Sequence, residues 1–243
     1  MNRISVFYDH IAEAAAQSGL SIGKVLEKCG EYGISAVEIQ YTRLKENRKT
    51  ICKALGKAGL SISYVYDFFD LGSDAPDKEI ERAYDMLKMA SELGAGKVLV
   101  VPGALNMAEA AELAACAGDY DTTAVYMDGN AVIQNMKKSL RQICEEAEKY
   151  GITVTMEDFD GFCQPFSRIN ELLWFMKNVP GLKYTLDTGN FAFSDENVLE
   201  AVEVMKDYIV HVHCKDRAVE ETVGGKYCKG MGASPVGGGY IPM

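Results

Sequence analysis

The stretch EEAEKYGITVTME, residues 145–157, runs from an amphipathic helical segment through a glycine straight into a run rich in β-branched residues. Glycine just past the end of a helix takes the left-handed cap conformation at little cost, so the chain can turn into a strand within about two residues. This stretch therefore predicts a helix-to-strand joint at Gly151.

Joints of the same kind recur along the chain. Four more copies with a glycine are EKCGEYGISAVEI (27–39), KALGKAGLSISYVY (53–66), SELGAGKVLVV (91–101) and MKNVPGLKYTLD (176–187), and VMKDYIVHVH (204–213) is a looser copy without one. With the first run, RISVF at 3–7, they predict seven strands that start near residues 3, 34, 61, 97, 152, 182 and 208. Strands that alternate with amphipathic helices, such as the segment 130–149, are typical of βαβ units and a parallel sheet.

The strands also indicate how this sheet is closed. In residues 152–157, the apolar Val154 and Met156 alternate with the polar Thr155 and Glu157. An open sheet with helices on both faces needs apolar residues on both, whereas a barrel packs its outer face on helices and can carry polar residues inside, near its mouth. We therefore expect an α/β fold, a (β/α)₈ TIM barrel formed by residues 1–243 as one domain, whose eighth βα unit is missing or incomplete at the C-terminus.

Composition excludes several classes of partner. The 243 residues carry a formal net charge of −10, which repels nucleic acid and anionic membranes, so small solutes are the expected ligands. The seven cysteines are scattered without a C-x-x-C pair, as expected for reduced thiols. No stretch approaches the run of about 20 apolar residues that a membrane span needs, and the first residues lack the apolar core of a signal peptide. A cytoplasmic protein without a membrane or nucleic-acid partner is expected.

Three neighbouring strands end in side chains that suit a reactive site. Glu157 and Asp187 occupy the last positions of their strands, and IVHVHCKD (209–216) holds two of the three histidines of the chain. Residues two apart on a strand face the same way, so His211 and His213 both point inward, with His213 nearer the C-terminal mouth. Barrel enzymes place their chemistry at this mouth, where the three strand ends deliver two carboxylates and an imidazole.

A divalent cation is the simplest partner for these groups. Two buried carboxylates pushed together without one would raise each other's pKa, and one would lose its charge by protonation. Oxygen and nitrogen donors suit Mn²⁺, Mg²⁺ or Co²⁺, and Zn²⁺ is compatible with them. The alternative is a set of unrelated ion pairs around a neutral core histidine, with Glu157 paired to Lys215. Asp187 would then pair with Lys183.

Three motifs resemble one known family. TMEDFD (155–160), LDTGNF (186–191) and HVHCKD (211–216), in this order and spacing, resemble the xylose isomerase-like barrel superfamily of sugar isomerases, 3-epimerases, inosose dehydratases and endonuclease IV-like proteins. The resemblance implies both metal ligands and residues near the substrate. The implied ligands are Glu157, Asp187 and His213, and the residues expected near the substrate are His211, Lys215, Asn190 and Asp216.

Two features depart from the family pattern. The family's fourth ligand is a glutamate on strand eight, and this chain ends at Met243, just as the helix before that strand begins. The last βα unit is therefore expected to be truncated, absent or supplied by another chain. In ketose 3-epimerases, a second glutamate and a histidine stand where this chain has Cys163 and Asn190. The pattern thus differs from that of the ketose 3-epimerases.

These observations predict a metal-dependent isomerase or epimerase that acts on a sugar, a sugar phosphate or a related polyol. The ion would stabilise an enediolate while Glu157 removes the neighbouring proton, and Lys215 or His211 would stabilise the oxyanion or relay protons. One alternative is a non-catalytic barrel subunit or ligand-binding relative without the fourth ligand. An endonuclease IV-like DNA-repair enzyme is disfavoured by the three histidines and the charge of −10. Assembly into a homo-oligomer is compatible with any of these functions.

Overall fold

A seven-stranded parallel sheet forms the centre of the fold. The computed structural model describes residues 3–219, 222–223, 226–227 and 232–242. The strands follow one another in chain order across the sheet: β1 (Ser5–Phe7), β2 (Ala36–Gln40), β3 (Ser61–Phe68), β4 (Lys97–Val101), β5 (Thr153–Glu157), β6 (Lys183–Asp187) and β7 (Ile209–His213). All seven predicted strands are confirmed, and each starts within two residues of its expected position.

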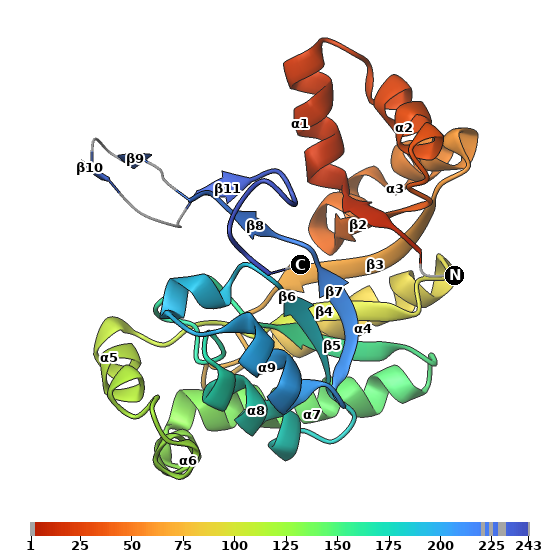
Figure 1. The fold of residues 1–243 in the computed structure, drawn as a ribbon. Helices are drawn as coiled ribbons and strands as arrows, with labels where there is room; N and C mark the ends of the chain where they lie inside the picture. Colours follow the sequence, from red (N-terminus) through yellow and green to blue (C-terminus); the bar gives the residue numbers. More distant parts are fainter. Residues whose placement is uncertain (1–2, 220–221, 224–225, 228–231, 243) are drawn as a thin grey trace.

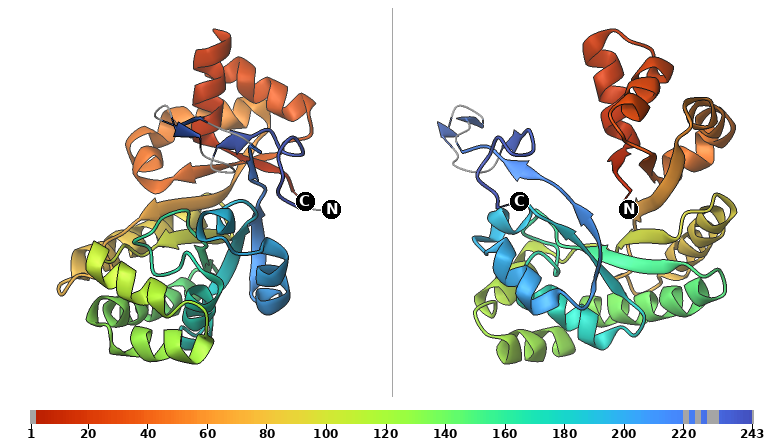
Figure 2. Two further views of the ribbon diagram at one scale, coloured as in Figure 1. Left: turned by 60° about the vertical axis from the view of Figure 1, so that its left-hand side comes forward. Right: turned by 45° about the vertical axis from the view of Figure 1, so that its right-hand side comes forward.

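Helices cover the outer side of this sheet. They are α1 (Tyr8–Ser18), α2 (Ile22–Glu31), α3 (Tyr41–Ala58), α4 (Asp77–Glu92), α5 (Met107–Ala115), α6 (Tyr120–Gly129), α7 (Ala131–Glu148), α8 (Ile169–Asn178) and α9 (Val198–Met205), with a short 3₁₀ helix η1 (Phe191–Ser194). The sheet curls into a half-barrel with α3, α4, α7 and α8 along its convex side (Figures 1 and 2). Helix α6 packs on α7 and α8, outside that layer.

The edges of the sheet agree with the expected incomplete barrel. In the described part of the chain, β1 and β7 are the two ends of the strand order. Beyond β7, two short antiparallel pairs follow: β8 (Asp216–Arg217) with β11 (Ala233–Ser234), and β9 (Thr222–Val223) with β10 (Lys226–Tyr227). The expected α/β barrel architecture, with an incomplete C-terminal unit, is therefore confirmed.

Glycines end the helices as the sequence predicts. At the five glycine joints, φ lies between 63° and 83°, at Gly33, Gly59, Gly94, Gly151 and Gly181. This is the left-handed region, which costs a residue with a Cβ about 1–2 kcal/mol. The next strand begins two or three residues after each of these glycines. The joints are therefore set by local backbone geometry.

Polar side chains of the strands face the interior of the half-barrel. The hydroxyl of Tyr64 on β3 contacts the hydroxyls of Thr155 on β5 and Thr185 on β6. Thr155 also donates to the carbonyl oxygen of Val98 at 3.1 Å. All of these side chains are buried. This layer confirms that the polar face of β5, with Thr155, and that of β6, with Thr185, point inward.

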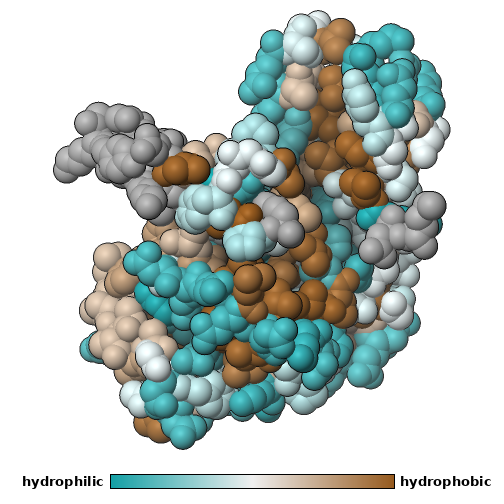
Figure 3. Space-filling model, viewed as in Figure 1, coloured by the Kyte–Doolittle hydropathy of each residue, from teal (hydrophilic) through white to brown (hydrophobic). Residues whose placement is uncertain are grey.

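The opposite face of β7 is partly exposed. Val210 and Val212 are 37% and 45% exposed, whereas the outward-facing Val154 of β5 is buried. Hydrophobic side chains gather around the lower centre of the molecule, where α9 and β7 lie and where Leu199 and Val204 are also exposed (Figure 3). The outer face of β7 is therefore less completely covered than that of the central strands.

The cysteines of the described residues are not joined by disulfides. The described residues contain six of the seven cysteines, and all six are free thiols, while Cys228 lies outside the described residues. None of the described helices combines the length and the hydropathy that crossing a bilayer requires.

Two glutamates cap the N-terminus of α8 by accepting hydrogen bonds from its backbone amides. Glu171, in the first turn, accepts hydrogen bonds from the backbone amides of Ser167 and Arg168 at 3.0 and 3.2 Å. Glu196, from the segment before α9, accepts one from the amide of Ile169 at 2.8 Å. Burial, partly offset by that hydrogen bond, raises the pKa of Glu196 to about 7. The stability of this helix end therefore depends on pH.

Two glycine substitutions near the end of α3 should have opposite effects. Gly59→Ala should lower the free energy of unfolding by about 1 kcal/mol, because Gly59 has a φ of 71°. Gly56→Ala should raise it by about 0.5–1 kcal/mol, because Gly56 lies inside the helix and an added Cβ meets no atom within 4 Å. Urea unfolding followed by circular dichroism measures both. Equal effects of the two substitutions would contradict the assigned end of α3.

The pH dependence of stability tests Glu196. Its pKa is about 7 in the folded protein against an ordinary value of 4.5, so between these values the folded protein holds a proton that the unfolded chain releases. Rising pH in this window therefore lowers stability. The melting temperature of the wild type should fall relative to that of Glu196→Gln between about pH 5 and about pH 8. Glu203→Gln, which removes an exposed carboxylate of α9, is the control. A difference that stays constant over this range would refute the assignment.

Candidate metal centre at the ends of the strands

The C-terminal ends of three adjacent strands meet at the mouth of the half-barrel. Glu157, Asp187 and His213 are the last residues of β5, β6 and β7. One donor atom of each lies within 4.8 Å of the donor atoms of the other two. Nδ1 of His213 contacts Oε1 of Glu157. Lys183, the alternative partner of Asp187, lies at the opposite end of β6. The structure therefore brings the three expected ligands together.

Burial and charge make this cluster suitable for a cation. Burial raises the pKa of Asp187 to about 6, and the neighbouring carboxylate of Glu157 adds to the rise. Burial lowers the pKa of His213, but the carboxylates of Glu157 and Glu38 outweigh it and raise that pKa to about 10. The surroundings thus already stabilise one positive charge on the imidazole. Two carboxylates and an imidazole also form a donor set that fits Mn²⁺, Mg²⁺, Co²⁺ or Zn²⁺.

A buried network behind Asp187 holds it in place. Oδ1 of Asp158 accepts hydrogen bonds from the hydroxyl of Tyr184 at 2.6 Å and from the amide of Asp187 at 2.8 Å. The amide of Gly189 donates to Oδ1 of Asp187 at 2.8 Å, and Nδ2 of Asn190 donates to the carbonyl oxygen of Asp158 at 2.7 Å. Burial, followed by the nearby carboxylates, raises the pKa of Asp158 well above its usual range. Sequence reasoning missed this residue, although its place inside the motif TMEDFD was a signal.

A second polar cluster lies beyond the end of β7. Nζ of Lys215 donates to Oδ2 of Asp160 at 2.8 Å and to Oδ1 of Asn190 at 2.6 Å. Nη2 of Arg217 donates to the same oxygen of Asp160 at 2.8 Å. Lys215 therefore pairs with Asp160, and not with Glu157 as the alternative reading supposed. The roles expected for Lys215 in catalysis and for Asn190 in substrate binding stay predictions.

Asp216 is occupied by backbone hydrogen bonds. The amides of Gly237 and Gly239 donate to its Oδ2 at 2.9 Å each, and the amide of Ile241 donates to Oδ1 at 3.2 Å. A Cβ at Gly239 would lie 2.2 Å from Oδ1 of Asp216, so this close approach requires glycine. Asp216 thus anchors the C-terminal loop, and its expected role in substrate binding stays a prediction.

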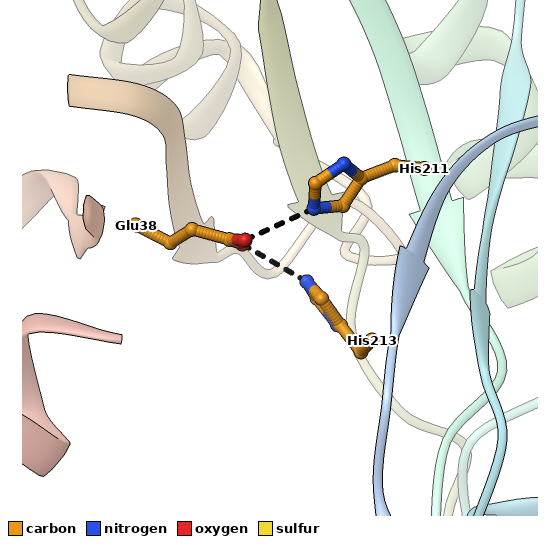
Figure 4. A group of neighbouring side chains, drawn as sticks. All are labelled: Glu38, His211 and His213. Carbon is orange, nitrogen blue, oxygen red and sulfur yellow. Dashed lines mark hydrogen bonds and ion pairs between the residues drawn. The ribbon is translucent and has the colours of Figure 1, made fainter. Parts of the chain in front are cut away.

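Glu38 on β2 completes the surroundings of the two histidines. Its Oε1 lies 3.0 Å from Nε2 of His211, and its Oε2 lies 3.0 Å from Nε2 of His213 (Figure 4). Burial raises the pKa of Glu38, but the hydrogen bonds from the two imidazoles outweigh burial and hold that pKa well below its usual range. The donors of these three residues also lie within 4.8 Å of one another. Glu38 was not predicted from the sequence. The feature that could have identified it is an acidic residue in the middle of the otherwise apolar start of the run AVEIQ (36–40).

Aromatic rings line the rim next to the cluster. Phe7, the last residue of β1, lies edge-on to His213 with 4.9 Å between ring centroids, and 5.4 Å from the ring of Tyr66. The series continues from Tyr66 to Phe68 at 6.5 Å and from Phe68 to Phe159 at 6.3 Å. Apolar faces beside a few polar donors are the usual lining of a small-molecule site.

Comparisons with known proteins find one family model and several similar structures. Residues 26–243 match the model described as xylose isomerase-like TIM barrel. No curated protein matches the chain.

Three of the similar solved structures illustrate the range of proteins that share the fold. The probable 3-DHS dehydratase from Bacillus anthracis has a TM-score of 0.67 and 18% identity, over 99% of this chain and 86% of that chain. The 3-keto-D-glucoside 4-epimerase from E. coli has a TM-score of 0.59 and 16% identity, over 84% and 77%. A barrel protein from Mycobacterium smegmatis in complex with magnesium has a TM-score of 0.64 and 17% identity, over 98% and 82%. At these identities the similarity shows a common fold.

Proposed function

Because the chain belongs to the xylose isomerase-like TIM barrel family, we propose that it is a divalent-metal-dependent isomerase or epimerase of a sugar, a sugar phosphate or a related polyol. The observation that carries this proposal is the convergence of Glu157, Asp187 and His213 at the mouth of the half-barrel. A keto-glucoside epimerase and a magnesium complex among the similar structures support it.

Three residues would hold the ion. They are Glu157 and Asp187, each through a carboxylate oxygen, and His213 through Nδ1. When bound, the ion supplies Lewis-acid stabilisation for negative charge that develops on adjacent substrate oxygens, as in an enediolate-type proton transfer. Mn²⁺, Mg²⁺ and Co²⁺ suit these mixed donors, and Zn²⁺ is compatible with them.

The chain's own side chains move the proton and bind the substrate. Glu157, at the end of β5, is the proposed base that removes the proton next to the substrate carbonyl. Lys215 and His211 are proposed to stabilise oxyanion charge or to relay the proton. Asn190 and Asp216 are proposed to contact the substrate, Asp216 in addition to anchoring its loop. The aromatic rim would pack against the apolar face of the sugar and exclude water.

The proposed partner is a small carbohydrate, in a cytoplasmic protein that binds neither nucleic acid nor membrane. The net charge of −10 and the free thiols of the six described cysteines support this. Assembly into a homo-oligomer is compatible with the proposal. A non-catalytic ligand-binding barrel is the second candidate, because the described residues supply three donors to the cluster where the family has four.

Metal binding is the first test. Calorimetric titration with Mn²⁺ should show one ion per chain. Asp187→Asn should weaken Mn²⁺ binding by more than about 100-fold. Loss of a residue that only hydrogen-bonds to a metal ligand costs about 10–100-fold, and loss of a ligand should cost more. Asp207→Asn is the matched control, since Asp207 lies just before the opposite end of the strand that carries His213. Folded protein that binds no divalent ion would favour the non-catalytic barrel.

Proton transfer is the second test. Incubation with a panel of ketoses, inososes and their phosphates in D₂O should exchange a carbon-bound proton of the true substrate, which proton NMR detects. Measured at saturating Mn²⁺, because Glu157 is also a proposed ligand, Glu157→Gln should slow this exchange by about 10²–10⁴-fold, the usual contribution of a general base. Metal binding without exchange on any member of the panel would argue against an isomerase or epimerase.

A further inference from the structure

We propose that Glu38 is a positioning residue that presents His213 to the ion. This inference rests on the proposed function, because it takes the ion to lie with Glu157 and Asp187. Glu38 contacts the other nitrogen of the ring: it lies at Nε2 of His213, whereas Glu157 contacts Nδ1. Glu38 therefore acts through His213.

The contact spans the interior of the half-barrel. Glu38 extends from β2, and each of its oxygens lies 3.0 Å from the Nε2 atom of one histidine of β7 (Figure 4). The hydroxyl of Ser5 donates to Oε1 at 2.5 Å. The side chain of Glu38 is only 5% exposed, so water cannot replace these partners. Because a carboxylate only accepts hydrogen bonds, both Nε2 atoms must donate.

This donation selects the nitrogen that can bind a metal. A neutral imidazole that carries its proton on Nε2 has a free lone pair on Nδ1. In His213, Nδ1 faces the carboxylate of Glu157, which accepts the Nδ1 proton in the metal-free protein. That proton is the one the ion would displace, which leaves the ring with its remaining proton on Nε2. Carboxylates that accept from the other nitrogen of a metal-binding histidine fix its tautomer and orientation and raise its basicity. Phe7 lies edge-on to the same ring. Glu38 thus prepares His213 for the ion.

His211 serves as the second anchor of Glu38. Nζ of Lys97 lies 3.4 Å from Nδ1 of His211 and donates to the carbonyl oxygen of Val210 at 2.8 Å. A lysine donor at Nδ1 leaves the proton of His211 on Nε2, where Glu38 accepts it. The ring of His211 also stacks on Tyr64 with 4.4 Å between centroids. His211 therefore holds the second oxygen of the Glu38 carboxylate in place.

The same contacts disfavour an ion among Glu38, His211 and His213. Such an ion would need a lone pair on Nε2 of both histidines, which would move the proton of each ring to Nδ1. In His211, that proton would face the amine of Lys97. On the Nδ1 side of His213 lie the carboxylates of Glu157 and Asp187. This described cluster contains no lysine in the position that Lys97 takes beside His211.

Nitrogen NMR of the histidine rings tests which nitrogen of His213 keeps its proton when metal binds. The chain has three histidines, so His10→Gln and His211→Gln identify the signals of His213. Metal-free wild type should show a proton on Nε2 of His213 that exchanges slowly with solvent, and Glu38→Gln should lose it. In cadmium-loaded wild type, the metal should couple to Nδ1 of His213 while the proton stays on Nε2. The wild-type spectra decide the question even if the variant does not fold.

Metal affinity supplies the second readout. Glu38→Gln should weaken Mn²⁺ binding by about 10–100-fold, as expected when a carboxylate partner of a ligating histidine is lost. Glu171→Gln is the matched control, because it also removes a buried glutamate but lies at α8, outside the site. This control should retain wild-type affinity.

The possible outcomes separate the two proposals. Unchanged Mn²⁺ affinity in Glu38→Gln, or cadmium bound to Nε2 of His213, would overturn the positioning role. Loss of affinity together with loss of the Nε2 proton would support it. Wild-type protein that keeps the Nε2 proton but binds no Mn²⁺ would overturn the proposed function while supporting the hydrogen bond from His213 to Glu38.

Discussion

The arrangement of the site depends on one buried interaction, in which the imidazole of His213 lies between Glu157 on one side and Glu38 on the other. Buried carboxylates need partners, because an unpaired charge in the interior is strongly destabilising. The ring of His213 hydrogen-bonds to a carboxylate from β5 and to one from β2, so it connects strands that lie far apart in the curled sheet. The lowered pKa of Glu38 and the raised pKa of His213 are two consequences of this contact.

The polar interior of the half-barrel makes such a contact possible. Tyr64, Thr155 and Thr185 form a buried hydroxyl layer whose members bond to one another. His211 stacks on Tyr64, so the charged groups at the mouth rest on a layer that is itself hydrogen-bonded. The aromatic rim bounds the same groups on another side. The strand ends thus carry the charged groups, and the hydroxyl layer and the stacked ring of Tyr64 pack beneath them.

Membership of the family does not choose the reaction, because one barrel carries many chemistries. The similar structures include a probable dehydratase and an epimerase at 18% and 16% identity. In this chain, Asn190 contacts Lys215, which in turn pairs with Asp160. This cluster lies beside the proposed ligands and differs from them in charge and exposure. The three proposed ligands match the family pattern, and we infer that the choice of substrate depends on such neighbouring groups.

The sequence by itself determined the local structure and the inward faces of the strands, because a left-handed glycine and an alternation of period two are properties of neighbouring residues. It also predicted that Glu157, Asp187 and His213 would meet, since adjacent parallel strands end at the same edge. The contacts of Glu38 with His211 and His213 join residues 173 and 175 positions apart. Periodicity shows which way Glu38 points, but only the curl of the sheet decides which side chain it meets across the interior.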